Sequence, residues 1–479
     1  MRRPIQVMKF GGTSVGDASC IERVVRIVQN ALPVGSIAVV VSAMGGVTNR
    51  LIEGANQSKA GNEVAVAELF AQLRKQHDEA VTALIRTTAR RMVLREKLDK
   101  LFSDAEILCR YTISRRELTP RTLDAISSLG ERLCAPLVAE ALAEGGVNSQ
   151  ALDATELVVT DSYHGGAEPL IELTRARCQA RVTPLLQNGV VPVVTGFIGA
   201  NEEGVLTTLG RGGSDYSATI LGAALDADEV VIWSDVSGLL TADPRLVADA
   251  CSIDEVSYRE AAELAYFGAK VLHPKTLRPV NRSGIPIWIK STFAPEDPGT
   301  KITLAGRRDV DGVKALAAVR DAALITISGP AAKGTPDALG RTVAAAAAVR
   351  ADVLVISQFP SHNDICLVVA SSIAERTVEA LRREFSPELR NKEVEPALSD
   401  AAVSVITLVG ENMRVTAEMV ARASAALGQE DVDVLATSQG SSDCSLSFVV
   451  LQQDMKIALE LLHRELGLGR LVSTTQVST

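Results

Sequence analysis

The sequence lacks the features that mark secreted and membrane-bound proteins. Its seven cysteines are scattered, odd in number and include no Cys-x-x-Cys pair, which excludes a disulfide framework and a cysteine-based zinc site. No apolar run reaches the roughly 18 residues that a membrane-spanning helix needs. The apolar stretch between Arg3 and Lys9 is also too short for a signal peptide. We therefore expect a cytoplasmic protein with no membrane partner.

Basic charge and aromatic residues are scarce as well. The chain has 49 Lys and Arg against 58 Asp and Glu, a net charge of -9, whereas nucleic acids and anionic membranes are bound by a basic face. Aromatic residues make up only 3%, so the core must consist mainly of Ala, Val, Leu and Ile. A hydrophobic content of 47% with 22% charged residues is typical of a folded globular protein.

The length of 479 residues suggests about three domains. From residue 5 onward, apolar strands alternate with Gly-rich turns and amphipathic helices, which indicates a mostly parallel sheet with helices on both faces. We expect strands at residues 5–10, 37–41, 190–195 and 230–234, and a helix at 20–30. Leucines at helical spacing between residues 63 and 144 predict a helical block.

The C-terminal third repeats itself. Residues 324–329, 356–358 and 367–369 match residues 405–410, 437–439 and 448–450, each at an offset of 81, which predicts a duplicated domain. Each copy reads as strand, helix, strand, strand, helix, a ferredoxin-like unit that is short of one strand. We expect domains at 1–298, 313–397 and 398–479, and we hypothesise that residues 313–319 supply the missing strand of the second copy.

Two Gly-rich turns follow expected strands near the N-terminus. The first is Lys9-Phe-Gly-Gly-Thr-Ser-Val-Gly16, and the second is Val41-Ser-Ala-Met-Gly-Gly-Val-Thr48. Glycines let the backbone approach a phosphate closely, the following helix offers free N–H groups, and Lys9 adds a positive charge. The lysine precedes the glycines, so this is not a Walker loop. Taken alone, either segment could equally be an ordinary turn.

Three further segments combine charged residues with small ones. Leu209-Gly-Arg-Gly-Gly-Ser-Asp-Tyr-Ser217 holds a cation and a carboxylate among glycines, where they contribute no packing. Residues 232–245 follow a strand and contain Asp235 and Arg245, and residues 265–274 place Lys270 in an apolar helical segment. Lys270 could instead reach water from that segment, and His273 is better explained as a structural histidine.

In their residues and in their order along the chain, these five segments and Ser128-Leu-Gly-Glu-Arg132 resemble the aspartokinase family of amino-acid kinases over residues 5–300. The C-terminal repeats look like its tandem ACT domains, and several of their segments are most similar to the threonine-sensitive branch that is fused to homoserine dehydrogenase. The resemblance implies an α/β, three-layer amino-acid-kinase fold with a mostly parallel sheet, followed by two α+β ferredoxin-like ACT domains. It also implies ATP-dependent phosphorylation of the L-aspartate β-carboxylate.

By the same resemblance, each candidate residue acquires a role. Lys9 and Asp215 would be catalytic, with Mg²⁺ accompanying ATP and no dedicated protein metal site. The residues expected to bind aspartate are Ser42, Thr48, Glu131, Arg211 and Ser214, those expected to bind ATP are Lys9, Gly11, Gly12, Ser234, Asp235, Arg245 and Lys270, and those expected to bind an effector are Gln358 and Gln439.

Several readings stay open at this point. The effector is expected to be threonine rather than lysine, and the ACT pair implies at least a homodimer. Leu240 stands where the family usually has tyrosine, a departure that would alter packing against the adenine or ribose of the nucleotide. A kinase acting on glutamate or N-acetylglutamate is one alternative. A catalytically inactive amino-acid sensor is another, although Lys9, Asp215 and Glu131 are all present.

Overall fold

The structure, a computed structural model, describes residues 3–268, 272–307, 312–329, 336–359, 364–398, 402–411, 413, 417–439 and 444–470. The chain divides into two compact units, and each is described by itself. Unit 1 comprises residues 1–239, 254–258 and 271–306, and unit 2 comprises residues 240–253, 259–270 and 307–479. Within the described ranges, no helix combines the length and apolarity that crossing a bilayer requires.

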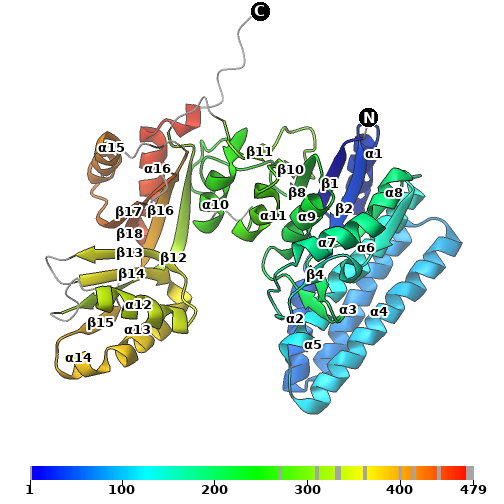
Figure 1. Cartoon of the computed structure of the whole chain (residues 1–479), viewed down its shortest axis with the longest axis horizontal. Helices are drawn as coiled ribbons and strands as arrows, with labels where there is room; N and C mark the ends of the chain where they lie inside the picture. Colours follow the sequence, from blue (N-terminus) through cyan, green and yellow to red (C-terminus); the bar gives the residue numbers. More distant parts are fainter. Residues whose placement is uncertain are drawn as a thin grey trace, which may run out of the picture. The chain divides into compact units, whose positions relative to one another are not determined.

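Unit 1 contains an eight-stranded sheet in the order β3-β5-β2-β1-β8-β10-β11-β9. Its pairs are parallel except for β10 with β11, as the sequence predicted. The near-continuous apolar runs of its central strands fit burial on both faces. The strands, labelled in part in Figure 1, are β1 (Ile5–Phe10), β2 (Ser36–Val41), β3 (Ser149–Leu152), β5 (Val191–Thr195), β8 (Glu229–Ser234), β9 (Glu255–Ser257), β10 (Ile287–Ser291) and β11 (Thr300–Thr303).

Helices cover both faces of this sheet. On one face lie α1 and α6, with α2, α3 and α4 outside them, and on the other face lie α8 and α9. The predicted helical block at 63–144 is confirmed. The helices are α1 (Ala18–Ala31), α2 (Val47–Ala60), α3 (Glu63–Leu84), α4 (Thr88–Arg115), α5 (Pro120–Ser127), α6 (Leu129–Glu144), α7 (Ile171–Arg181), α8 (Thr183–Gln187), α9 (Gly213–Ala224) and α11 (Arg278–Asn281). A small sheet is formed by β4 (Val159–Thr160), β6 (Ile198–Asn201) and β7 (Leu206–Thr208).

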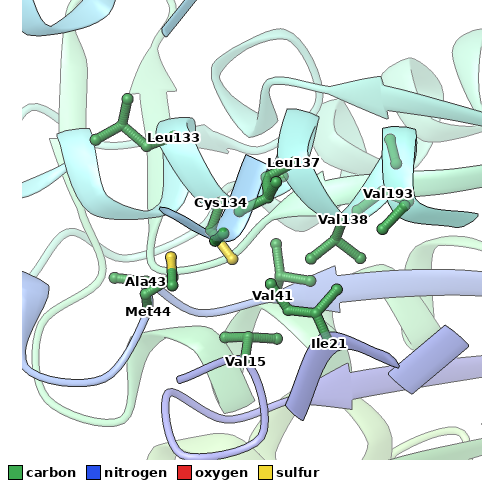
Figure 2. Packing of buried hydrophobic residues seen from close by; sticks show 14 of the residues in the cluster. Val15, Ile21, Val41, Ala43, Met44, Leu133, Cys134, Leu137, Val138 and Val193 are labelled. Atoms are coloured by element: carbon green, nitrogen blue, oxygen red, sulfur yellow. The ribbon is translucent and has the colours of Figure 1, made fainter. Parts of the chain in front are cut away.

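The main core of unit 1 lies between α6 and the sheet. Figure 2 shows Leu137 and Val138 of α6 packed toward Val41 of β2 and Val193 of β5. Aliphatic and small side chains dominate this contact, in keeping with the low aromatic content, and burying each one stabilises the fold by about 1.5 to 3 kcal/mol. The core therefore fixes α6, whose first turn carries Glu131, against the strands that lead into the Gly-rich turns.

Six parallel strands of unit 1 end at the same edge of the sheet. In spatial order these are β3, β5, β2, β1, β8 and β10. The segments after β2 and β1 are the two Gly-rich turns, and the segment after β8 begins with Asp235. In an open parallel sheet, ligands bind in the crevice outside the carboxyl ends of the strands. The fold thus brings the two Gly-rich turns and Asp235 to the edge where a ligand is expected.

Unit 2 is built from two related copies. The register is the same in both, because Leu324 pairs with Val368 and Val405 pairs with Val449 at the predicted offset of 81. The duplication is therefore confirmed. The elements are β12 (Ala315–Ser328), α12 (Pro336–Ala348), β13 (Val353–Phe359), β14 (Asp364–Ala370), α13 (Ser371–Glu384), α14 (Ser386–Arg390), β15 (Glu395–Leu398), β16 (Val403–Val409), α15 (Ala417–Gly428), β17 (Val434–Gln439), β18 (Ser445–Leu451) and α16 (Met455–Glu465).

The long strand β12 is shared by the two copies. Its first half, residues 315–319, pairs with β16 of the second copy, and its second half pairs with β14 of the first. The interleaving hypothesis requires this pairing. The expectation that the first copy is also short of a strand was wrong, because β15 pairs with β12. A four-residue strand that contains Pro396 and is mostly exposed carries too little apolar alternation to be recognised from sequence.

Two segments that the sequence assigned to the first domain group with unit 2. Ala242 and Val247, from residues 240–253, lie in the same apolar cluster as Ile406. Glu260, from α10 (Tyr258–Tyr266), forms a buried ion pair with Lys314 at 3.0 Å. The boundary at residue 298 remains a prediction. These contacts indicate that unit 2 also includes residues that precede position 298.

Candidate active site

The Gly-rich turns after β1 and β2 lie against each other. A Cβ atom on Gly12 would stand 3.2 Å from the Ala43 carbonyl oxygen, and one on Gly45 would stand 3.6 Å from the Gly12 carbonyl oxygen. The Gly11 N–H donates to the Trp233 carbonyl oxygen over 3.1 Å, which joins the first turn to the end of β8. Small residues are needed for such close backbone packing, and the same property lets backbone N–H groups approach an anion.

Lys9 and Asp215 form an ion pair at this edge of the sheet. Lys9 Nζ lies 2.5 Å from Asp215 Oδ1, and the two side chains are 10% and 16% exposed. Lys9 comes from β1, and Asp215 from the first turn of α9, which follows Gly212 in the left-handed conformation with φ of 68°. The partial positive charge of the helix N-terminus favours a carboxylate there. The pair holds the lysine ammonium in one place beside the first Gly-rich turn.

Glu131 places a second carboxyl group in the same region. Its side chain is 3% exposed, and burial raises its pKa to about 8, although the Ala43 N–H and the Lys9 charge both act in the opposite direction. Glu131 Oε2 has no hydrogen-bond partner among the described residues. Gly130 lets the start of α6 lie close to the turn after β2, since a Cβ on Gly130 would stand 2.5 Å from Ala43 Cβ. A cationic ligand beside this buried carboxyl group would favour its ionised form and pair with it.

The other residues predicted to bind the substrate lie on neighbouring segments of unit 1. Ser42 and Thr48 are half-buried at the turn after β2. Ser214 is the second residue of α9, and its Cβ lies only 2.8 Å from where a Cβ on Gly196, after β5, would stand. Arg211 is exposed and has no ion-pair partner in the part of the chain that the structure describes. Its guanidinium is therefore available to an anion.

The residues predicted to bind a nucleotide are divided. Ser234 and Asp235 follow β8 in unit 1, where the Ser234 hydroxyl donates to Asp235 Oδ1 over 3.0 Å. Arg245 belongs to unit 2, is 76% exposed and pairs with Asp243 at 2.8 Å. Lys270 lies outside the described residues. No group of three or more His, Cys, Asp or Glu side chains suited to a metal ion occurs within the described residues.

The two predicted effector residues occupy equivalent positions in unit 2. Gln358 pairs with Ile365 and Gln439 pairs with Leu446 in the same register. Their strands, β13 and β17, lie at the two ends of the main strand order of the sheet and contact each other. Gln358 Nε2 is buried without a hydrogen-bond partner in the described ranges, whereas Gln439 is exposed.

Sequence reasoning missed Asp124, which joins three segments around the site. Its carboxylate accepts four hydrogen bonds, from His164 Nδ1 at 2.8 Å, the Gly165 N–H at 3.1 Å, and the Thr208 N–H and hydroxyl at 3.3 and 2.6 Å. Asp124 lies on α5 just before α6, and Thr208 lies just before the segment that holds Arg211. A single aspartate in a short helix gives no sequence signal of this role.

Comparison with known proteins identifies related families and structures. Residues 4–291 match the amino acid kinase family and residues 406–466 match the ACT domain. The crystal structure of E. coli aspartokinase III in complex with aspartate and ADP, in the R-state, is similar over 97% of this chain and 100% of that chain, with 30% identity and a TM-score of 0.80. Its T-state complex with lysine and aspartate has 29% identity, a TM-score of 0.79 and coverage of 96% and 99%.

Curated relatives agree with this match. Aspartokinase 1, chloroplastic, of Arabidopsis thaliana is 30% identical over 465 residues, which cover 96% of this chain and 79% of that protein. The bifunctional aspartokinase/homoserine dehydrogenase of Haemophilus influenzae is 30% identical over 468 residues, which cover 96% of this chain and 56% of that protein. The chain thus spans about half the length of the bifunctional relatives that it matches.

The role of Asp124 leads to a stability prediction. We expect Asp124→Asn to lower the free energy of unfolding by about 3 kcal/mol, because an amide offers one acceptor oxygen where four donors converge. Urea unfolding at neutral pH measures the change. Asp104→Asn, at an exposed position on α4, is the matched control and should shift stability by less than about 0.5 kcal/mol. Equal, small effects of the two substitutions would contradict the joining role.

Proposed function

This chain belongs to the aspartokinase family, and we propose that it transfers the γ-phosphoryl group of ATP to the β-carboxylate of L-aspartate. The observation that carries the proposal is the shielded Lys9–Asp215 pair beside the buried carboxyl group of Glu131. A cation for the phosphates and a carboxyl group that can ionise to bind an amino group are thereby available at one edge of one sheet.

The aspartate end of the site follows from the charges of the substrate. Glu131 would accept the α-ammonium group, for which its unpartnered oxygen is suited. Arg211 would bind a carboxylate through two parallel N–H donors, the geometry that a guanidinium favours. Ser42, Thr48 and Ser214 would donate hydroxyl hydrogen bonds that orient the β-carboxylate. This carboxylate is ionised at neutral pH, so the reaction needs no general base.

The main obstacle to the reaction is electrostatic, because both reactants are anions. Two unit charges about 4 Å apart interact by about 1 kcal/mol in water but by about 4 kcal/mol at an effective dielectric constant near 20. Lys9 is largely shielded from water, so its charge acts at the stronger end of that range. Together with the N–H groups of Gly11 and Gly12, it would neutralise the transferring phosphoryl group and align it with the carboxylate.

The nucleotide side of the proposal includes Mg²⁺. Magnesium in phosphoryl-transfer sites is held largely by phosphate oxygens and water and needs only one or two protein carboxylates. Asp215 and Asp235 fit that requirement, since neither is fully buried. The ion would bind with ATP and offset the phosphate charge. Ser234 and Asp235 would contact the nucleotide, and Arg245 and Lys270 stay part of the proposed nucleotide set.

We also propose the organisation around this reaction. Residues 1–298 would form the kinase domain, with ACT domains at 313–397 and 398–479 and pairing between chains to give at least a dimer. Gln358 and Gln439 support threonine as the inhibitor. A lysine complex is known for E. coli aspartokinase III, so titration with each amino acid separates the two. The seven free thiols support a cytoplasmic location.

Replacing Lys9 tests the proposal directly. We expect Lys9→Ala to lower kcat for aspartate at least ~100-fold, equivalent to about 3 kcal/mol, because the charge on the phosphoryl group is no longer offset. Coupled ADP-release assays measure this loss, with glutamate and N-acetylglutamate as competing acceptors. Lys75→Ala, at a residue whose side chain is 78% exposed, is the control and should leave kcat unchanged. Near-normal turnover by folded Lys9→Ala would refute the assigned role.

The raised pKa of Glu131 predicts how aspartate binding depends on pH. With a pKa of about 8, the free protein holds this group mostly protonated at neutral pH, whereas an ammonium ligand requires the carboxylate. Binding must therefore release a proton, and the apparent KM for aspartate should fall about tenfold per unit as pH rises from about 6 to 8, then level off. Initial rates at saturating MgATP measure this.

Glu131→Gln provides the comparison for the pH profile. This variant cannot titrate, so its KM for aspartate should be high and independent of pH over the same interval, while its KM for ATP stays near that of the unmodified chain. If the unmodified chain gave a flat KM for aspartate from about pH 6 to 8, Glu131 could not be the group that accepts the ammonium.

A further inference from the structure

A groove lies on the face of the unit 1 sheet that is opposite to Lys9. Side chains alternate between the faces of a strand, so Gln6 and Met8 of β1 project away from the face that carries Lys9. The groove has a volume of about 360 Å³ and continues over β8 and β10, with α1 along one side. This volume lies in the range of small-molecule sites, and no residue with a role in the proposed reaction lines it.

The strand register arranges the groove in three rows. Gln6 lies beside Glu229 at one end, Met8 pairs with Val231 and Val231 with Trp288 in the middle, and Trp233 lies beside Lys290 at the other end. The end rows are four residues apart, about 13 Å at the rise of a β-strand. The groove is thus polar at both ends and apolar between them.

Two of the residues that line the groove each have a buried polar atom that lacks a partner among the described residues. Trp233 is 6% exposed, yet its indole Nε1–H has no hydrogen-bond acceptor within the described residues. At the other end, Gln6 Nε2 donates to Glu229 Oε1 at 2.5 Å, which leaves Gln6 Oε1 buried and without a donor. Buried indole N–H and amide groups normally find partners. A lining residue at one end of the groove therefore carries an unsatisfied donor, and a lining residue at the other end carries an unsatisfied acceptor.

Positive charge is concentrated at the Trp288 ring. Lys290 Nζ and Lys301 Nζ lie 5.3 and 5.4 Å from its centroid. Neither lysine has an ion-pair partner among the residues that the structure describes. In a chain of net charge -9, two unpaired lysines beside an aromatic ring favour an anionic ligand that has a flat apolar body.

We infer that this groove is a binding site for an aromatic carboxylate with a hydroxyl group at the far end of its ring. The carboxylate would accept from Lys290 and from Trp233 Nε1–H, the ring would lie over Met8 and Val231 beside Trp288, and the hydroxyl would donate to Gln6 Oε1. The carboxylate and the hydroxyl group of this ligand would thus serve as partners for Lys290 Nζ, Trp233 Nε1 and Gln6 Oε1, which have no hydrogen-bond or ion-pair partner among the described residues. The inference is independent of the reaction proposed for the opposite face.

The tryptophans make the site directly measurable, because the chain contains only two and both line the groove. Titration of the full chain with 3-(4-hydroxyphenyl)propanoate, with excitation selective for tryptophan, should give a saturable fluorescence change with a Kd on the order of 1 mM or tighter. The matching alcohol, 3-(4-hydroxyphenyl)propan-1-ol, should bind at least about tenfold more weakly because it lacks the anion. No saturable change, or an equal response to the alcohol, would overturn the inference.

Two variants locate the binding within the groove. Lys290→Met keeps the apolar stem of the side chain and should weaken binding about tenfold, whereas Trp233→Phe keeps a ring without the N–H and should weaken it about fivefold. Lys75→Met is the matched control, because Lys75 lies on α3 and does not line the groove. This variant should bind the ligand as the unmodified chain does. Unchanged affinity in folded Lys290→Met and Trp233→Phe would place the ligand elsewhere and refute the site.

Discussion

Lys9 and Asp215 bring a cation and a carboxylate within 2.5 Å of each other at the carboxyl edge of the sheet, and the rest of the candidate site is arranged around that contact. The central strand β1 supplies the lysine, and the first turn of α9 supplies its partner. An ammonium group on a flexible exposed stem would be screened by water and would contribute little. Held in a shielded position, the same charge can offset repulsion between two anionic reactants.

Glu131 and Asp215 illustrate how the surroundings give two carboxyl groups different properties. Asp215 lies at a helix N-terminus and is paired with a lysine. Glu131 is buried against the turn after β2, where desolvation outweighs the Ala43 N–H and the Lys9 charge and raises its pKa. One carboxylate thus fixes the cation, while the other stays available for an ammonium group. Separating the environments of two acids in this way is a general means of assigning them different roles.

The motifs that could be predicted from the sequence are those in which the functional residues directly follow a recognisable strand. Lys9, Gly11 and Gly12 follow one apolar run, so their position at the end of a strand could be predicted from their neighbours. The repeat in unit 2 was equally predictable, because a fixed offset of 81 residues survives in the apolar pattern.

Other features depend on contacts between distant segments and carry no local signal. The four donors of Asp124 come from residues 40 to 84 positions away. The burial that raises the Glu131 pKa likewise arises only when α6 packs on β2. Residues 240–253 were assigned to the first domain by their order in the chain, yet their apolar side chains pack within unit 2. The groove beside Trp233 exists only because β8 and β10 pair in a particular register.

We propose that this edge of the sheet lets a phosphoryl group move from ATP to a carboxylate, and the chemical nature of the product shows whether it does. An acyl phosphate reacts with hydroxylamine to give a stable hydroxamate, which can be identified by mass spectrometry. Folded chain incubated with MgATP, L-aspartate and hydroxylamine should yield aspartyl hydroxamate in amounts that require all three. ADP release without any hydroxamate, or no reaction from properly folded protein, would show that this site does not phosphorylate aspartate.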